Sequence, residues 1–172
     1  MPILIGFGFL IAAALLLAKK TDAYAPKMGG DMTPIPTVVK ATLDDQIRYS
    51  AQKYGVEFKL VKAVAMTESS LNPNASNPSD PSWGLMGIMP ILAEDFGIVK
   101  DYHNITEAEK AMIRDPQTNL NIGAWHLARL TKKYPFDTAV QMYNCGETGY
   151  NRGVRVPEYL AKVKQHYAEL SK

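Results

Sequence analysis

Glu68 stands out because its carboxyl group falls on an otherwise apolar helical stripe. It follows Val64 by four residues and Val61 by seven, so all three side chains project from one face of a helix expected over residues 57–70. Burial without a cationic partner raises the pKa of a carboxyl group and keeps it protonated near neutral pH. A protonated carboxyl is the donor that general-acid catalysis requires. The pattern therefore predicts a general acid, with a solvated carboxylate at a frayed helix end as the alternative.

Other residue types that do chemistry lack partners at a useful spacing. The single cysteine, Cys145, excludes an intrachain disulfide and a multi-cysteine zinc site, so we interpret it as a packed free thiol. Three histidines are too scattered for a metal motif: His103, His126 and His166. Four carboxylates fall in expected loops or at helix ends, where solvated charge is ordinary: Asp80, Asp95, Asp101 and Glu147. We expect no metal and no cofactor, and no obvious carboxylate partner for Glu68.

The composition narrows the class of protein. The chain has 172 residues, of which 47% are hydrophobic, with 19 basic and 17 acidic side chains. The apolar content excludes a disordered chain, and the near balance of charge excludes a strongly basic nucleic-acid-binding surface. The length suits one ordinary domain plus a short appendage.

Residues 2–18 form an uncharged apolar run, PILIGFGFLIAAALLLA. A helix over this run would span roughly 25 Å, at the short end of what crosses a bilayer core. We favour a retained membrane anchor over residues 1–20, with a signal peptide cleaved near Ala23–Ala25 or a buried core helix as alternatives. The positive-inside rule would place Lys19 and Lys20, which follow the run, in the cytoplasm.

The remainder reads as a linker over residues 21–42 and an all-α domain over residues 43–172. Prolines and glycines interrupt the linker, whereas apolar residues of the domain recur at helical spacing and no run alternates as a strand. Helices are expected over residues 43–54, 57–70, 90–96, 116–134 and 137–145, and two more from 107 and from 157 onward. Their start signals are Thr42, Pro90, Thr106 with Glu109, Asp115, Asp137 and Pro157. Loops are expected over residues 76–90 and 146–156.

Five short segments of the domain resemble the ordered motifs of one family. They are Met66–Pro73 (MTESSLNP), Gly84–Pro90 (GLMGIMP), Asp115–Gly123 (DPQTNLNIG), Met142–Gly146 (MYNCG) and Pro157–Tyr159 (PEY). They resemble the E-S-x-x-N-P, G-L-M-Q-I-M-P, D-P-x-x-N-I-x-x-G, A-Y-N-x-G and P-x-x-Y motifs of soluble lytic transglycosylases (SLT) in the lysozyme-like superfamily. Each motif alone is weak, but the ordered set covers residues from about 43 to 170.

The resemblance implies a lysozyme-like helical domain, of the goose-type lysozyme and SLT kind, that cleaves peptidoglycan. Its acid would be Glu68, which protonates the glycosidic oxygen between N-acetylmuramic acid and N-acetylglucosamine. The family lacks a carboxylate nucleophile; the substrate's N-acetyl group assists and the muramyl C6 hydroxyl attacks, giving a 1,6-anhydro product. The alternatives are a hydrolytic lysozyme on the same fold, or a catalytically inactive wall-binding or structural virion protein.

The resemblance also assigns roles to other motif residues. Tyr143 would lie near the catalytic acid and bond to it or to the N-acetyl group, and Asn144 would fix the loop backbone beneath it. Ser69 would hold the catalytic turn by hydrogen bonds rather than act as a nucleophile, since no His or Lys is fixed beside it. The wall of the sugar cleft would be formed by Gly84, Leu85 and Met86.

Gly87 departs from the family pattern, because the family usually has glutamine at this position. The glutamine amide reaches the sugar, so its loss removes a polar contact of about 1 kcal/mol. The departure puts sugar binding in question, together with the choice between transglycosylation and hydrolysis.

The expected substrate restricts where the protein acts. Peptidoglycan lies outside the cytoplasmic membrane, which conflicts with the topology that Lys19 and Lys20 suggest. A virion-borne enzyme escapes this conflict, because it is delivered as the virion penetrates the host. We therefore expect a membrane-anchored bacteriophage virion protein, with a periplasmic, secreted or inner-membrane-anchored enzyme of a secretion system as the alternative. The expected partners are peptidoglycan glycan strands, a membrane bound through residues 2–18, and other virion or secretion-machine proteins, but no nucleic acid.

Overall fold

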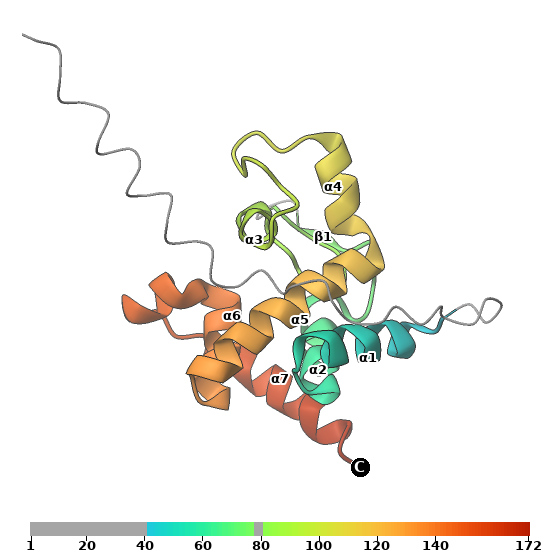
Figure 1. Cartoon of the computed structure of the whole chain (residues 1–172). Helices are drawn as coiled ribbons and strands as arrows, with labels where there is room; N and C mark the ends of the chain where they lie inside the picture. The colour runs from blue at the N-terminus through green and yellow to red at the C-terminus, as the bar shows by residue number, and fades with distance from the viewer. Residues whose placement is uncertain (1–40, 78–80) are drawn as a thin grey trace, which may run out of the picture. The chain divides into compact units, whose positions relative to one another are not determined.

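The computed structural model of this chain describes residues 41–77 and 81–172 (Figure 1). The expected anchor, residues 1–20, and nearly all of the expected linker, residues 21–42, lie outside the described residues. Among the helices that the structure describes, none has the combined length and apolar character needed to cross a membrane.

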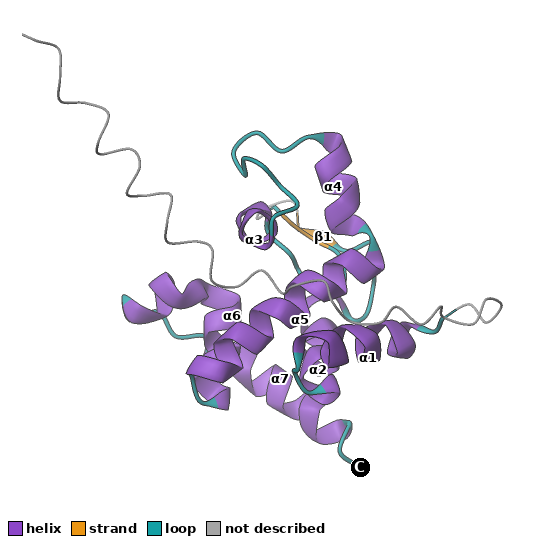
Figure 2. Ribbon diagram, viewed as in Figure 1, coloured by secondary structure: helices purple, strands orange, loops and turns teal. Residues whose placement is uncertain are grey.

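Helices dominate the described residues, as the sequence predicts (Figure 2). The elements are α1 (Leu43–Tyr54), α2 (Phe58–Ser69), β1 (Ser76–Asn77), β2 (Ser82–Trp83), α3 (Pro90–Phe96), α4 (Glu107–Arg114), α5 (Pro116–Lys133), α6 (Phe136–Asn151) and α7 (Pro157–Glu169). The two strands pair antiparallel, with Ser76 opposite Trp83. The sequence predicts only a loop here, because two-residue strands are too short to produce an alternating pattern.

Local capping signals explain where several helices begin and end. Thr42 and Asp45 form a reciprocal capping box at the start of α1, and Thr106 and Glu109 form another at the start of α4. Gly55 ends α1 in the left-handed conformation, with φ of 68°. These signals need no tertiary contact, so the sequence predicts them correctly.

The helix α6 differs from its expected form in two respects. It begins at Phe136 with Pro135 as its N-cap, so the expected cap at Asp137 is wrong. The Asp137 carboxylate instead binds the Nζ of Lys164 at 3.0 Å and joins α6 to α7. A kink at Gly146, with φ of 73° and ψ of 155°, ends the first segment where expected, but helical turns resume within the loop expected over residues 146–156.

The long helix α5 crosses the middle of the described domain (Figure 1). It packs against α1, α2, α3, α4 and α6, while α7 packs along α2. The core between them consists of wholly buried aliphatic side chains that include Ile47, Val61, Val64, Leu120 and Leu127. Because α2 lies among α1, α5 and α7, its C-terminal end is held at a fixed place in the fold.

Candidate active site

Glu68 lies in the last turn of α2, directly before an abrupt change in backbone direction. Ser70 and Leu71 both adopt positive φ values, of 54° and 63°. A left-handed conformation costs a non-glycine residue on the order of 1 kcal/mol, so two in succession must be held by their surroundings. The chain therefore leaves α2 sharply, immediately after the candidate acid.

Ser69 supplies part of the restraint on this turn. Its Oγ donates a hydrogen bond to the carbonyl of Ala65 at 3.0 Å and lies 2.9 Å from the carbonyl of Leu85. The hydroxyl thus connects the end of α2 to the segment that follows β2. Its contacts are those of a structural residue, and they leave no base beside it to activate a nucleophile.

The Glu68 carboxyl group is partly buried and accepts one hydrogen bond, from the Tyr159 hydroxyl to Oε1 at 2.6 Å. Burial raises its pKa from 4.5 to about 7, and the Tyr159 hydrogen bond opposes that rise. Burial raises the pKa of Tyr159 well above its ordinary value, so the phenol stays a neutral donor. Near neutral pH a large fraction of Glu68 therefore carries a proton that it can transfer, as its place on the apolar stripe predicts.

A wholly buried amide, Asn119 of α5, organises the turn between β2 and α3. Its Oδ1 accepts the Met86 N–H at 2.8 Å, and its Nδ2 donates to the carbonyls of Trp83 at 2.7 Å and Ile113 at 2.9 Å. Gly84, with φ of +75°, lies so close to this amide that a Cβ there would collide with it. The asparagine of the D-P-x-x-N-I-x-x-G segment thus fixes the backbone beside Glu68 from within the core.

The structure changes the expected role of two residues in this turn. Leu85 and Met86 are wholly buried, so their side chains offer no surface to a sugar, and they support the wall from behind rather than forming it. Gly123 of α5 leaves room for the Met86 side chain, because a Cβ at residue 123 would lie 2.6 Å from the Met86 Cε. Apolar side chains in a glycine-rich segment suggest an exposed wall, but both side chains pack into the core, and Met86 occupies the space that Gly123 leaves on α5.

Tyr143 of α6 lies beside this turn and does not bond to the acid. Its hydroxyl donates to the carbonyl of Met86 at 2.8 Å, and its ring lies 5.5 Å from that of His126. The tyrosine that bonds to Glu68 is instead Tyr159, which marks the expected start of α7 in the sequence but is not among the expected site residues. The two partners lie 91 residues apart, and only the packing of α7 on α2 brings them together.

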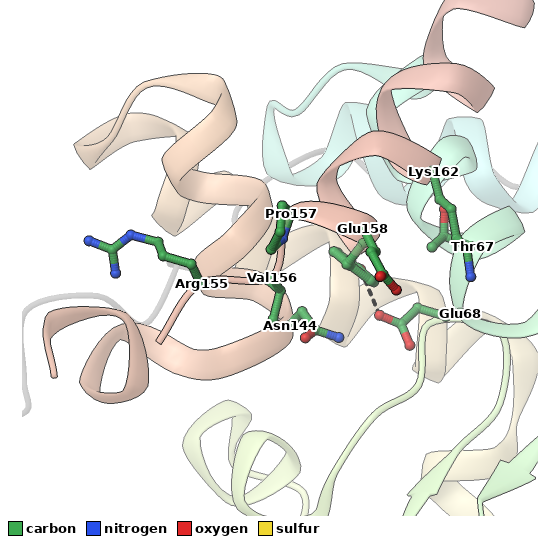
Figure 3. Close-up of a pocket in the computed structure, with 9 residues that line it drawn as sticks. Thr67, Glu68, Asn144, Arg155, Val156, Pro157, Glu158 and Lys162 are labelled. Atoms are coloured by element: carbon green, nitrogen blue, oxygen red, sulfur yellow. Dashed lines mark hydrogen bonds between the residues drawn. The ribbon is translucent and has the colours of Figure 1, made fainter. Parts of the chain in front are cut away.

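Glu68 and Tyr159 line an open pocket of about 490 Å³ (Figure 3). The other lining residues are Thr67, Asn144, Arg155, Val156, Pro157, Glu158 and Lys162. The exposed side chain of Asn144 points toward Glu68 across the pocket (Figure 3) and makes no hydrogen bond to another described residue. The expectation that Asn144 fixes the loop backbone is therefore wrong, and its amide faces the pocket.

Sequence reasoning missed three charged groups of this pocket, because all three come from the segment that opens α7. The Arg155 guanidinium points away from Glu68 (Figure 3). It stacks 3.7 Å from the Tyr150 ring centroid and donates to the Tyr150 carbonyl. Glu158 and Lys162 are exposed at the pocket. Of the carboxylates expected to be solvated, Asp95, Asp101 and Glu147 do not line it, and Asp80 lies outside the described residues.

The described residues thus form a mainly helical domain that holds one partly buried carboxyl group, with a raised pKa, at an open pocket. The sequence model of the transglycosylase SLT domain family matches residues 45–164. This match covers well over half of the chain, so the chain belongs to the transglycosylase SLT domain family, as its five motifs predict.

Curated relatives agree with this assignment. "Membrane-bound lytic murein transglycosylase C" from Yersinia enterocolitica is 33% identical over 90 residues, which are 51% of this chain and 24% of that protein. The protein of the same name from Serratia proteamaculans is 33% identical over 92 residues, again covering 51% of this chain and 24% of the relative. This chain thus spans about a quarter of the length of these relatives.

The crystal structure of the 70 kDa soluble lytic transglycosylase SLT70 from Escherichia coli shares the fold. The TM-score is 0.51 and the identity 22%, over 73% of this chain and 22% of that protein.

Proposed function

We propose that this chain is a peptidoglycan lytic transglycosylase that cleaves the β-1,4 bond between N-acetylmuramic acid and N-acetylglucosamine. The observation that carries the proposal is the Glu68 carboxyl, whose pKa burial raises to about 7 beside an open pocket of about 490 Å³. The relatives named as lytic murein transglycosylases and the family membership support it.

In the proposed reaction Glu68 acts first as an acid and then as a base. Its neutral carboxyl gives a proton to the glycosidic oxygen as the bond to the muramyl C1 breaks, while the substrate's N-acetyl oxygen stabilises C1. The Glu68 carboxylate then takes the proton of the muramyl C6 hydroxyl, whose oxygen closes on C1 as the N-acetyl group leaves. The acid regains its proton, no water is consumed, and the product is the 1,6-anhydro sugar.

The surrounding residues take separate parts in this proposal. Tyr159 holds one oxygen of the acid, and Asn144, which faces Glu68 with an unpaired amide, binds a polar group of the sugar. Tyr143 and Ser69 act indirectly, because their hydroxyls hold the carbonyls of Met86 and Leu85 and so keep the pocket wall in place. Gly84 has no side chain, which allows that wall to lie close to Asn119.

A hydrolytic lysozyme is the second candidate, and one specific observation favours it. Glu158 places another carboxylate on the pocket that contains Glu68. In a two-carboxylate glycosidase the second group acts as a nucleophile or activates water, so Glu158 would be that group here. The two reactions differ in product mass, since the anhydro product is lighter by one water.

Mass spectrometry of the soluble products from purified peptidoglycan separates these candidates. We expect anhydro-muropeptides from the wild-type protein and from Glu158→Gln, and none from Glu68→Gln. Reducing-end products that disappear in Glu158→Gln would make the protein a lysozyme. If the folded wild-type protein released no product, the inactive wall-binding alternative would replace both.

We further propose that the domain opens the wall locally, from a membrane-anchored position, as a bacteriophage virion penetrates its host. The apolar run of residues 2–18 and the words "membrane-bound" in the relatives' names support the anchor. A periplasmic enzyme of a secretion system is the alternative. Detection of the protein in purified virions supports the first role, and its presence only in the host envelope fraction supports the second.

A further inference from the structure

Gly87 lies against the Glu68 carboxyl group, where a side chain would collide with the carboxyl in its present position. It adopts φ of +59° in the turn between β2 and α3 and is partly exposed. A Cβ built at this position would lie 2.5 Å from the Glu68 Oε2 and 3.1 Å from its Cδ. The acid thus occupies the space where any other side chain at residue 87 would begin.

The two oxygens of the Glu68 carboxyl have different surroundings. Oε1 accepts the Tyr159 hydrogen bond at 2.6 Å, whereas Oε2 faces Gly87. In a neutral carboxyl the carbonyl-type oxygen is the better acceptor, so the Tyr159 bond favours Oε1 in that role and leaves the transferable proton on Oε2. The proton therefore rests on the oxygen beside the glycine.

We propose that Gly87 is a positioning residue. Because it has no side chain, the Glu68 Oε2 can lie against the turn, and the glycosidic oxygen of the substrate can reach Oε2 past the Gly87 Cα. The placement of Oε2 stands on the geometry alone. The approach of the glycosidic oxygen rests on the proposed function.

Neighbouring glycines show what a side chain at residue 87 would disturb. At Gly84 a Cβ would meet Asn119, whose hydrogen bonds hold the turn, so a substitution there breaks the structure. At Gly87 the nearest atom is the end of the Glu68 side chain, which can rotate. An added methyl group therefore displaces the acid and leaves the fold in place.

Gly55 provides a matched control for the backbone cost. Its φ of +68° is close to the +59° of Gly87, and a Cβ there would have no neighbour within 4 Å. Gly55→Ala and Gly87→Ala thus force a similar left-handed conformation on alanine, but only Gly87→Ala pushes on Glu68. A second pair, Gly55→Asn and Gly87→Asn, uses the residue that tolerates this conformation best after glycine, should either alanine variant fold poorly.

The experiment measures the Glu68 pKa by carbon-13 NMR of the full chain without substrate, together with kcat and KM on purified peptidoglycan. We expect both alanine variants to lose similar thermal stability. Only Gly87→Ala should shift the Glu68 pKa, with a fall expected because the displaced carboxyl moves toward the open pocket, and lower kcat by about 10²-fold with little change in KM.

Two outcomes overturn the inference: a Glu68 pKa in Gly87→Ala equal to that in Gly55→Ala, or equal kcat in the two variants. The NMR titration needs no substrate, so it tests the placement of Oε2 even if the wild-type chain proves inactive on peptidoglycan. An active wild-type protein with an unmoved pKa in Gly87→Ala would refute the role of Gly87 and leave the proposed function standing.

Discussion

Replacing Tyr159 with phenylalanine should move the pH dependence of activity upward. The variant removes the hydroxyl that donates to the Glu68 Oε1 at 2.6 Å and keeps the ring that packs in the domain. This bond stabilises the ionised form of Glu68 and lowers its pKa, against the rise that burial causes. Without it, Glu68 should hold its proton to higher pH.

The size of the shift follows from the kind of hydrogen bond. A bond at this distance to a carboxylate is charge-assisted and contributes roughly 1.5–3 kcal/mol, whereas one to the neutral acid contributes about 1 kcal/mol. The difference, roughly 0.5–2 kcal/mol, corresponds to a pKa shift on the order of one pH unit. Because the reaction needs protonated Glu68, wild-type activity should fall as pH rises through about 7. In Tyr159→Phe that fall should occur about one pH unit higher.

The assay is the pH profile of kcat/KM on purified peptidoglycan, which reports the free enzyme. Tyr167→Phe is a matched control, because Tyr167 also lies on α7 and donates its hydroxyl to a carboxylate, that of Glu57, but does not line the pocket. The control should leave the profile unchanged. A Tyr159→Phe profile that superimposes on wild type, or moves downward, would refute the assignment of Glu68 as the titrating acid held by Tyr159.

Four further outcomes follow from particular side chains. Asn119→Ala should cost about 2–5 kcal/mol in denaturant unfolding, because it removes a hydrogen bond from each of three buried backbone groups, of which the Trp83 carbonyl keeps its bond from the Ile88 N–H. Asn144→Ala should leave stability within about 0.5 kcal/mol and raise KM, since that amide is exposed at the pocket. Glu68→Gln should increase stability by up to about 3 kcal/mol at pH 8 with no gain at pH 4. His126→Leu should remove the His126 contribution to stability, which falls by up to about 3 kcal/mol between pH 6.5 and 4 because burial lowers the pKa of His126 to about 4.

The features of the fold and of the site that the sequence could predict are those with a local cause. The caps at Thr42 and Thr106 depend on residues three positions apart, and the placement of Glu68 on an apolar stripe depends on one helix. The raised pKa of Glu68 follows from that placement, since burial is its largest cause. Ordered motifs then supplied the family, and the family model confirms it.

The parts that sequence missed depend on which helix packs against which. Tyr159 reaches Glu68 only because α7 lies along α2, and no periodicity within either helix encodes that pairing. Met86 enters the core where Gly123 leaves room on α5, which depends on a residue more than thirty positions away. Asn144 faces the pocket, two residues before the kink of α6 at Gly146, and the sequence alone does not show which way its side chain points.

The predicted effects of Glu68 and His126 on the pH dependence of stability oppose each other, so neither should be visible in the stability curve of the wild-type protein. Between pH 4.5 and 6.5 the folded state holds the Glu68 proton and an uncharged His126, whereas the unfolded state has lost the first proton and gained the second. The two states then bind equal numbers of protons at these sites, so the pair contributes no slope to stability against pH. Glu68→Gln should expose a rise of about 1.4 kcal/mol per pH unit relative to wild type, and His126→Leu a fall of the same size. Parallel stability curves for wild type and both variants across this window would show that neither group titrates as its burial requires.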